Sequence, residues 1–303
     1  LTLQIELDYD VKKLTSFKCG GKVKKVYFPE NLSEFERVLS ENPNIPVFGN
    51  LSNTLVSSDG YNGAIVLTTR MNKFTINGTS VVAECGLKGP KLAQAVAEAG
   101  LSGLEFMIAF PGSIGGEVFM NAGAHGQSVA DCFVEAVCYN RDEGKIVTLS
   151  KKTMAFDYRT SICQSFDLVV LSATFELQKA LRKSDIEAKM NENLAFRKAK
   201  QPSLALPNCG SVFRNPEGDS AGRLLDAAGV KGLTVGGVEV WENHANFIIN
   251  SKNGTSLDIL EIMDIMYSQV KEQFNIELRP EVRYLGNKNE KEDELCKKLK
   301  MIK

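Results

Sequence analysis

The first part of the chain alternates apolar and polar positions at periods typical of short strands and one helix. Ser33-Glu34-Phe35-Glu36 fits a capping box and predicts the start of that helix. Its apolar stripe is formed by Phe35, Val38 and Leu39. Strands are predicted at residues 45–48 and 64–68. We interpret residues 1–72 as a first small unit.

A second unit with longer strands follows. Residues 80–85 predict a strand, and residues 91–99 predict a helix that stops at Gly100, since glycine suits a C-terminal cap. Runs rich in β-branched residues predict further strands at 133–140, 145–149 and 168–177. These elements define a second unit over residues 73–180.

The composition changes near residue 180. Residues 179–200 are charged and contain neither glycine nor proline, which predicts a helical connector with one buried face. A helix is predicted at 221–228, and a longer one begins near residue 257, behind Thr255 as N-cap and Asp258 three residues on. The apolar face of the longer helix is formed by Ile259, Ile262, Ile265, Met266 and Val270.

Strands at 245–249 and 277–285 complete this part of the chain. We interpret residues 181–286 as a C-terminal domain, and residues 287–303 as a charged tail that is either frayed or helical. The whole pattern predicts an α+β protein with a two-part N-terminal half and a smaller C-terminal domain.

Composition and charge narrow the class of protein. The 303 residues are 43% hydrophobic, and their net charge of −1 gives no reason to expect nucleic acid or an anionic membrane as a partner. No apolar run reaches the roughly 18 residues that span a bilayer, and residues 1–4 do not resemble a signal peptide. Scattered cysteines without a C-x-x-C pair fit a reducing compartment, and two histidines disfavour a zinc site. We expect a cytoplasmic protein without a metal.

The most informative stretch is rich in glycine. It runs through Pro111-Gly112-Ser113-Ile114-Gly115-Gly116 and on to Gly126. Glycine loses much conformational freedom on folding, so such a cluster indicates that the backbone approaches something closely. The residues alone leave two interpretations open, a tight structural corner or a cradle of backbone N–H groups for an anion.

Several familiar motifs are absent from the sequence. No G-x-G-x-x-G follows a strand and no G-x-x-x-x-G-K-[ST] occurs, which disfavours a Rossmann fold and a P-loop. No G-x-S-x-G occurs either, which disfavours a serine hydrolase. If the glycine-rich stretch holds a phosphate, another scaffold supports it.

Eight short motifs follow one another along the chain in a particular order. They are TSFKCGG at 15–21, GLEF at 103–106, YRTS at 158–161, QP at 201–202, GSVFRNP at 210–216, DSAG at 219–222, HANF at 244–247 and EV at 281–282. In this order and spacing, the chain from about residue 15 to residue 286 resembles the UDP-N-acetylenolpyruvoylglucosamine reductases. These flavoenzymes complete the muramic acid building block of bacterial peptidoglycan.

The resemblance implies a fold and a set of small-molecule partners. It implies a two-subdomain FAD-binding half of the vanillyl-alcohol-oxidase type, with noncovalent FAD between the subdomains, and a C-terminal domain that closes over a UDP-sugar. NADPH is then the co-substrate. Residues 160–200 leave no room for an extra substrate lid, which resembles the shorter subtype of the family. We expect a monomer with no nucleic acid or membrane partner.

The match to the family also assigns catalytic residues. Arg159 matches an arginine whose planar fork suits a carboxylate that gains charge, although its residue type fits an exposed arginine paired with Asp157 equally well. Ser211 matches the proton donor, and its alternative role is a turn residue that caps local backbone. Glu281 matches a carboxylate that assists Arg159, and its alternative is a strand glutamate paired with a neighbouring arginine.

Binding residues follow from the same match. The expected cofactor residues are Gly49, Asn50, Leu51, Ser52, Asn53, Pro111, Gly112, Ser113, Gly115, Gly116, Asn121 and Gly123. The expected substrate residues are His125, Arg197, Lys200 and Asn215. Arg197 and Lys200 stand three apart on a predicted helix and can share one face, where the alternative is a solvated basic surface. His244 is interpreted as structural, and Cys209 as inert packing.

Some positions depart from the family pattern. The first glycine turn, Gly-Gly-Gly-Ser-Asn in the family, reads Gly49-Asn50-Leu51-Ser52-Asn53 here, and leucine tolerates a positive φ poorly. Glu117 stands where alanine is common, and a charged carboxylate there repels a bound phosphate. His125 replaces a common tyrosine, and Ala109 a common glycine.

Two other functions fit parts of the pattern. A different flavin oxidase on the same scaffold predicts a tethering His or Cys and a larger substrate domain, and neither is evident. A non-catalytic nucleotide-sugar binder with a degenerate flavin loop leaves Arg159, Ser211 and Glu281 without a role, yet all of them are present.

Overall fold

The computed structural model of the protein describes residues 3–203, 205–287 and 289–301, and the chain divides into two units. Unit 1 contains Val26–Asn50 and Ile65–Arg197 together with the described residues up to Ile5. Unit 2 contains Glu6–Lys25 and Leu51–Ala64 together with the described residues from Lys198 onward. The domain limits expected at residues 72, 180 and 286 stay a prediction.

The prediction that residues 1–4 do not form part of a signal peptide includes residues 1 and 2, which lie outside the described residues. Within the described part of the chain, no helix is both long and apolar enough to cross a membrane.

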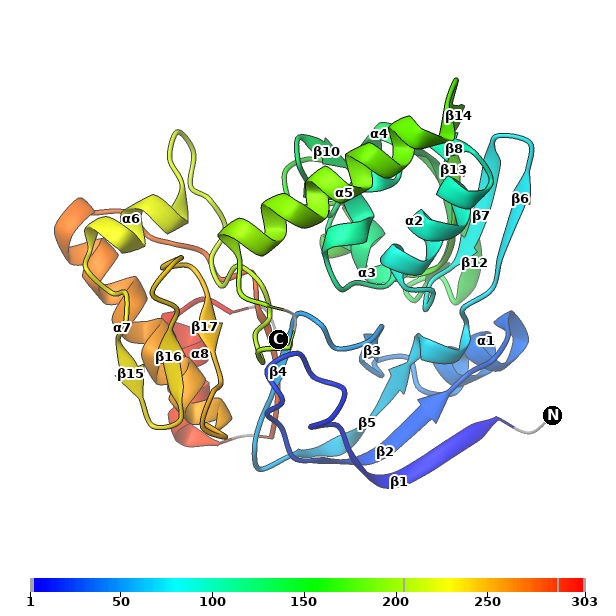
Figure 1. Ribbon diagram of the computed structural model, residues 1–303. Coiled ribbons are helices and arrows are strands. Elements are labelled where there is room, and N and C mark those ends of the chain that lie inside the picture. The colour runs from blue at the N-terminus through cyan, green and yellow to red at the C-terminus, as the bar shows by residue number, and fades with distance from the viewer. Residues whose placement is uncertain (1–2, 204, 288, 302–303) are drawn as a thin grey trace. The chain divides into compact units, whose positions relative to one another are not determined.

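Unit 1 is built on a five-stranded antiparallel sheet (Figure 1). Its strands, in spatial order, are β12 (Lys145–Ser150), β11 (Phe133–Asn140), β13 (Leu168–Glu176), β7 (Ser80–Glu84) and β6 (Phe74–Asn77). Helices α2 (Gly89–Glu98) and α3 (Ile114–Phe119) share a buried apolar core with this sheet. The strands expected in this region are confirmed, and β11 has the predicted ends.

The helix α2 also ends as predicted. Gly100 follows it with a φ of +76°, and its backbone N–H donates to the carbonyl of Ala97 over 2.9 Å. Glycine adopts this left-handed conformation without the steric cost of a side chain. The helix begins at Gly89, earlier than predicted, because Pro90 fits the first turn.

The first helix of unit 1 starts at a different cap from the predicted one. Helix α1 (Leu32–Glu41) is capped by Asn31, whose side chain accepts a hydrogen bond from Glu34 N at 3.0 Å. The expected capping box at Ser33 is therefore wrong by two residues. The buried face of α1 is formed by Phe35, Val38 and Leu39, as predicted.

Short elements connect the larger ones of unit 1. The paired short strands are β8 (Leu101–Ser102) with β14 (Gln178–Lys179), and β9 (Gly123–Ala124) with β10 (Gln127–Ser128). The short helices are η1 (Thr68–Arg70), η2 (Glu105–Ala109), α4 (Val129–Cys132) and η3 (Ile162–Gln164). The long helix α5 (Lys183–Lys200) belongs to unit 1 up to Arg197. Helix α5 buries Ile186, Asn193 and Arg197, so the expected connector with one buried face is confirmed.

A four-stranded sheet contains the N-terminal strands. Its order is β1 (Gln4–Asp10), β2 (Lys22–Phe28), β5 (Tyr61–Leu67) and β3 (Val47–Phe48). Strand β3 runs parallel to β5 and is shorter than predicted. Pro46 has no N–H to donate to the ladder, although its carbonyl accepts from Val66 N at 2.9 Å.

Unit 2 packs three helices with short strands. The helices are α6 (Ala221–Ala227), α7 (Ser256–Phe274) and α8 (Glu290–Lys298). The strands are β15 (Thr234–Val235), β16 (Val238–Val240) and β17 (Ile248–Ile249) in one antiparallel sheet, and β4 (Thr54–Val56) parallel to β18 (Arg283–Leu285). Helix α7 has the predicted capping box of Thr255 and Asp258. Its expected apolar face is buried except for Ile265, which is half-buried.

Two strands predicted for unit 2 are shorter in the structure. The last one reduces to Arg283–Leu285, because Pro280 cannot donate to a ladder and forms only an isolated bridge with Phe213. The one expected at 245–249 reduces to Ile248–Ile249. There the backbone turns instead, with His244 N bonded to Trp241 O and Phe247 N bonded to His244 O.

The tail is helical within its described residues. Helix α8 is capped by Asn289, whose side chain accepts from Glu292 N. Cys296, Leu299 and Met301 join the core of unit 2. Of the two interpretations left open for the tail, the helical one therefore holds.

Candidate functional site

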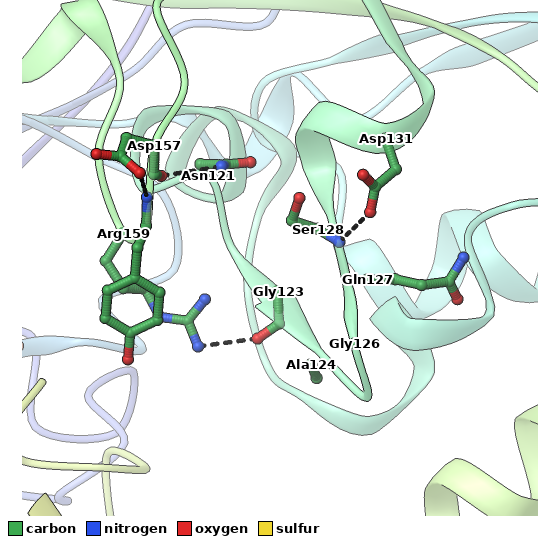
Figure 2. A pocket seen from close by; sticks show the side chains of 10 residues that line it. Asn121, Gly123, Ala124, Gly126, Gln127, Ser128, Asp131, Asp157 and Arg159 are labelled. Atoms are coloured by element: carbon green, nitrogen blue, oxygen red, sulfur yellow. Dashed lines mark hydrogen bonds between the residues drawn. The ribbon is translucent and has the colours of Figure 1, made fainter. Parts of the chain in front are cut away.

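A pocket of about 480 Å³ lies beside the glycine-rich stretch of unit 1 (Figure 2). Its walls come from the β9–β10 hairpin, from Asp131 of α4 and from the loop at 157–159. Three of the predicted site residues line it: Asn121, Gly123 and Arg159. The sequence motifs around residues 121 and 159, which are 38 positions apart (159 − 121), thus meet at one cavity.

Arg159 is held in position by the hairpin. Its Nη2 atom donates to the carbonyl oxygen of Gly123 at 2.8 Å (Figure 2). Its guanidinium lies 5.4 Å from the ring centre of Tyr158. Its φ of +55° is costly for a residue with a side chain and persists only where the surroundings impose it. Such strain is found at sites where a side chain must point in one direction.

Asn121 connects the glycine-rich stretch to the arginine loop. Its Nδ2 donates to the carbonyl of Asp157 at 3.0 Å, and its Oδ1 accepts from Ala130 N at 3.0 Å. Asn121 is buried and has a φ of +42°, a conformation that asparagine tolerates better than most residues. These contacts make it a support for the pocket wall that carries Arg159.

Glycines in both predicted cofactor loops, at residues 49–53 and 111–116, let the backbone lie very close to other atoms. A Cβ added at Gly49 would overlap Ser113 Oγ, and a Cβ added at Gly115 would lie 2.9 Å from the Cβ of Cys85. The N–H groups of Ile114 and Gly115 donate to the carbonyls of Leu87 and Cys85. Gly115 therefore builds a tight structural corner, while Gly49 brings the first glycine turn against Ser113 of the second.

Glu117 lies in the first turn of α3 and is 3% exposed. A Cβ added at Gly89 or Gly112 would overlap its carboxyl group. Neither of its carboxyl oxygens has a hydrogen-bond partner among the residues that the structure describes. Burial raises the pKa of Glu117 to about 8, so the group is mostly protonated at neutral pH. The repulsion expected from a charged Glu117 is therefore largely absent there.

The first glycine turn carries the strain that its sequence predicts. Leu51 has a φ of +55°, and its side chain is 2% exposed. Asn53, two residues on, donates from Nδ2 to the carbonyl of Glu281 at 2.9 Å, and its own carbonyl accepts from Arg283 N. The end of this turn is thereby fixed to the segment that carries Glu281.

Ser211 and Glu281 lie on neighbouring segments of unit 2. The N–H of Glu281 donates to the carbonyl of Val212 at 2.8 Å, and Phe213 bridges to Pro280. Both side chains are half-buried, and Glu281 is outside any strand. The structure brings these two predicted catalytic residues together, whereas Arg159 belongs to unit 1.

Arg197 and Lys200 differ in exposure despite their helical spacing. Arg197 is buried, donates from Nη1 to the carbonyl of Ala109 at 2.8 Å, and has its pKa lowered by burial. Lys200 is exposed at the last position of α5. The alternative of a solvated basic face is therefore wrong for Arg197, and its role toward a diphosphate stays a prediction.

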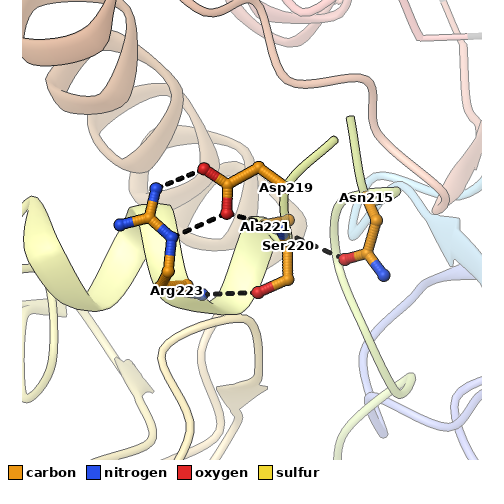
Figure 3. Close-up of polar contacts among 5 residues, drawn as sticks. All are labelled: Asn215, Asp219, Ser220, Ala221 and Arg223. Carbon is orange, nitrogen blue, oxygen red and sulfur yellow. Dashed lines mark hydrogen bonds and ion pairs between the residues drawn. The ribbon is translucent and has the colours of Figure 1, made fainter. Parts of the chain in front are cut away.

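Asn215 supports the start of α6 (Figure 3). Its Oδ1 accepts from Ala221 N at 3.0 Å, and Ser220 caps the helix by accepting from Arg223 N at 3.2 Å. An ion pair between Asp219 and Arg223 completes this turn and lowers the pKa of Asp219 to about 2. The role of Asn215 toward a substrate stays a prediction.

The two histidines have different surroundings. His125 sits at the tip of the β9–β10 hairpin with a φ of +55°, and its ring meets Phe196 edge-on at 5.2 Å. His244 packs on Phe247, and its Nδ1 accepts from Asn246 N at 3.2 Å. Burial lowers the pKa of His244. These contacts agree with a structural role for His244.

Sequence reasoning missed two residues that shape this site. Gly89 encloses Glu117, and its signal was a Gly-Pro pair at a helix start. Arg141 donates to the carbonyls of Pro43 and Ile45 at 2.5 and 2.6 Å, ahead of the first glycine turn. No sequence signal distinguishes Arg141 from a surface arginine.

The residues around Gly49 and Ser113 fit a bound dinucleotide such as FAD. The two predicted cofactor loops approach closely there, and the orphaned carboxyl behind the second loop carries little charge at neutral pH. In the described ranges no cluster of His, Cys, Asp or Glu could hold a metal ion.

Two protein family models match separate parts of the chain. Residues 23–150 match the family described as FAD binding domain. Residues 201–285 match the family described as UDP-N-acetylenolpyruvoylglucosamine reductase, C-terminal domain. The protein thus contains an FAD-binding domain.

Individual relatives cover nearly the whole chain. A UDP-N-acetylenolpyruvoylglucosamine reductase of Caldicellulosiruptor bescii is 39% identical over 92% of this chain and 90% of its own length. That of Latilactobacillus sakei is 37% identical over 95% of this chain and 96% of its own length. The crystal structure of UDP-N-acetylenolpyruvylglucosamine reductase from Thermus caldophilus superposes with a TM-score of 0.78 at 30% identity, covering 93% of this chain and 98% of that one. The chain belongs to the UDP-N-acetylenolpyruvoylglucosamine reductase family.

Proposed function

We propose that the protein catalyses the FAD-dependent reduction of UDP-N-acetylglucosamine enolpyruvate to UDP-N-acetylmuramate, with NADPH as the reductant, in peptidoglycan precursor synthesis. The observation that carries this proposal is the family match along nearly the whole chain, including both the FAD-binding and the C-terminal domain. The anchored Arg159 at the pocket of unit 1 supports it.

The reaction saturates a vinyl ether by adding a hydride and then a proton. Bound FAD would supply the hydride that adds to the terminal carbon of the vinyl group, after its own reduction by NADPH. The electron pair of the double bond then moves to the adjacent carbon and into the substrate carboxylate. An enzyme has to stabilise this developing charge and protonate that carbon.

Arg159 is suited to the charge that develops on the carboxylate. Its guanidinium presents donors in a fixed plane, and the contact of Nη2 with Gly123 O fixes the orientation of that plane at the pocket. A guanidinium in this position stabilises the charge that the carboxylate gains, by hydrogen bonds and by its own positive charge.

Ser211 is the proposed proton donor, and Glu281 the proposed assistant. The Ser211 hydroxyl is a weak acid and can protonate only a strongly basic carbon held close to it. We propose that Glu281, whose backbone N–H bonds to the carbonyl of Val212 next to Ser211, exchanges a proton with the donor or orients it. The strand-glutamate alternative for Glu281 loses support, because its backbone is not in a strand.

Further residues are proposed to bind the small molecules. For FAD these are the first turn at residues 49–53, the second loop at Pro111, Gly112, Ser113, Gly115 and Gly116, and also Asn121 and Gly123. For the UDP-sugar they are His125, Arg197, Lys200 and Asn215. We propose a monomeric cytoplasmic enzyme without nucleic acid or membrane partners.

The visible absorption spectrum tests the proposal. The purified protein is expected to be yellow with about one flavin per chain, and to oxidise NADPH when the enolpyruvyl UDP-sugar is added. S211A is expected to keep flavin reduction by NADPH and to lose most turnover, since it removes only the proton donor. A colourless protein that does not take up FAD contradicts the proposal.

A further inference from the structure

Glu117 differs from two other deeply buried glutamates of this protein. Glu105 accepts hydrogen bonds from Ser102 Oγ at 2.5 Å and Gly103 N at 3.0 Å. Glu292 accepts from Ser57 Oγ at 2.7 Å and from the Tyr284 hydroxyl at 2.6 Å. Glu117, equally buried, has no such partner within the described residues. A carboxyl group buried without partners is costly when charged, so its neutral form is favoured at this position.

The space around Glu117 is built for its side chain. Its carboxyl group fills the positions that a Cβ would take at Gly89 and Gly112. The backbones of these two glycines are joined by a hydrogen bond from Gly89 N to Gly112 O at 3.2 Å. The carboxyl is thus enclosed directly against the second cofactor loop, where solvent does not reach its oxygens.

Nearby elements do not compensate a charge at this position. Helix α2 carries Lys91 and Glu98 and follows Lys88, while β7 ends at Glu84 and is followed by the buried Cys85 thiol. The other elements packed on α3 carry only acidic groups and thiols, namely Asp131 and Cys132 on α4, Cys163 on η3 and Glu176 on β13. Segment 110–116 has no titratable side chain. Burial is the sole cause of the raised pKa of Glu117, and no neighbouring charge contributes to it.

We propose that Glu117 is a further residue on which FAD binding depends. Its carboxyl group lies behind the second FAD loop and has to be protonated for FAD to bind. This inference rests on the proposed function, because it takes the loop at residues 111–116 as part of the FAD site. FAD brings a doubly charged diphosphate. An ionised carboxylate beside it would have neither solvent nor a cation to screen the repulsion.

The sign of the pH dependence follows from linkage. Below about pH 8 Glu117 is already protonated without FAD, so binding does not depend on this group. Above about pH 8 the apoprotein has lost the proton, and binding has to take one up. The dissociation constant of FAD is therefore expected to rise by up to about tenfold per pH unit above that point.

The experiment titrates the apoprotein with FAD, followed by flavin fluorescence, from about pH 6 to about pH 9. E117Q keeps the size of the side chain but cannot ionise, so its FAD affinity is expected to stay constant over this range. E98Q, an exposed residue of the neighbouring α2, removes the same charge and is expected to behave as the unmodified protein. In weak buffer near pH 9, adding FAD is expected to consume protons with the unmodified protein and not with E117Q.

The outcomes separate this inference from the proposed function. If the unmodified protein binds no FAD at any pH, both fail. If it binds FAD with equal affinity at about pH 7 and about pH 9, or if E117Q shows the same pH dependence, only the role of Glu117 is overturned. Proton uptake by the unmodified protein decides the matter even if E117Q does not fold.

Discussion

At the scale of single residues, the sequence predicts backbone strain better than it predicts burial, as two departures from the family pattern show. The replacement of glycine by Leu51 predicts a strained turn, and the φ of +55° confirms it. The sequence did not indicate that the Leu51 side chain would be buried, because neighbouring polar residues suggest an exposed loop. In the same way, the charge of Glu117 was inferred from residue type, whereas its burial, which largely removes that charge at neutral pH, depends on Gly89 and Gly112.

Leu51 gives a test in which strain and burial oppose each other. L51A leaves a cavity and is expected to lower the free energy of unfolding by about 3 kcal/mol. L51G loses slightly more apolar surface but relieves the left-handed backbone, so we expect it to be about 1 kcal/mol more stable than L51A. Urea denaturation of both apoproteins measures the difference. The usual order, with glycine less stable than alanine, would show that the backbone at residue 51 is not strained.

At the scale of elements, the long periodic segments were predictable and the contacts between them were not. Strand β11 has the predicted ends because its β-branched residues and flanking turns are local signals. Arg141, which follows this strand, holds the segment before β3 through Pro43 and Ile45, almost a hundred positions earlier. Its burial and its ion pair with Asp167 at 3.3 Å depend on this packing. Sequence patterns carry no trace of such a contact.

Arg141 is expected to position the first glycine turn for FAD. R141Q removes the two hydrogen bonds that hold residues 43–45, and we expect it to weaken FAD binding by about tenfold and to shift the flavin absorption band. R141K keeps the charge but not the fork, so it is expected to recover only part of the affinity. R182Q, which breaks an exposed pair with Asp185, serves as the matched control. A folded R141Q with unchanged FAD affinity would refute this role.

At the scale of the whole molecule, hydrogen bonds between residues far apart in sequence hold the tail helix in unit 2. Glu292 of the tail helix accepts hydrogen bonds from Ser57, which follows β4, from Tyr284 of β18, and from Ser256 of α7. The sequence predicts only a charged tail that is either frayed or helical. The buried face of α8 begins with Glu292, and a hydrophobic residue at that position would have indicated a buried helix. Cys296 and Leu299 continue that stripe at helical spacing. A buried polar network therefore joins α8 to the rest of unit 2, although its composition is typical of the surface.

Removing this network is expected to destabilise unit 2 strongly. In E292Q an amide replaces the carboxyl group that contacts three hydroxyl groups, so at least one of these hydroxyls loses its partner, and we expect the free energy of unfolding to fall by about 3 kcal/mol. Y284F removes a single donor and is expected to cost about half as much, since Glu292 keeps its other bonds. E290Q, on the exposed side of the same helix, controls for the loss of charge and is expected to have almost no effect. Denaturant titrations compare the three variants. If E292Q resembled E290Q, the tail helix would not depend on its buried carboxylate, and apolar packing through Cys296, Leu299 and Met301 would suffice to hold it.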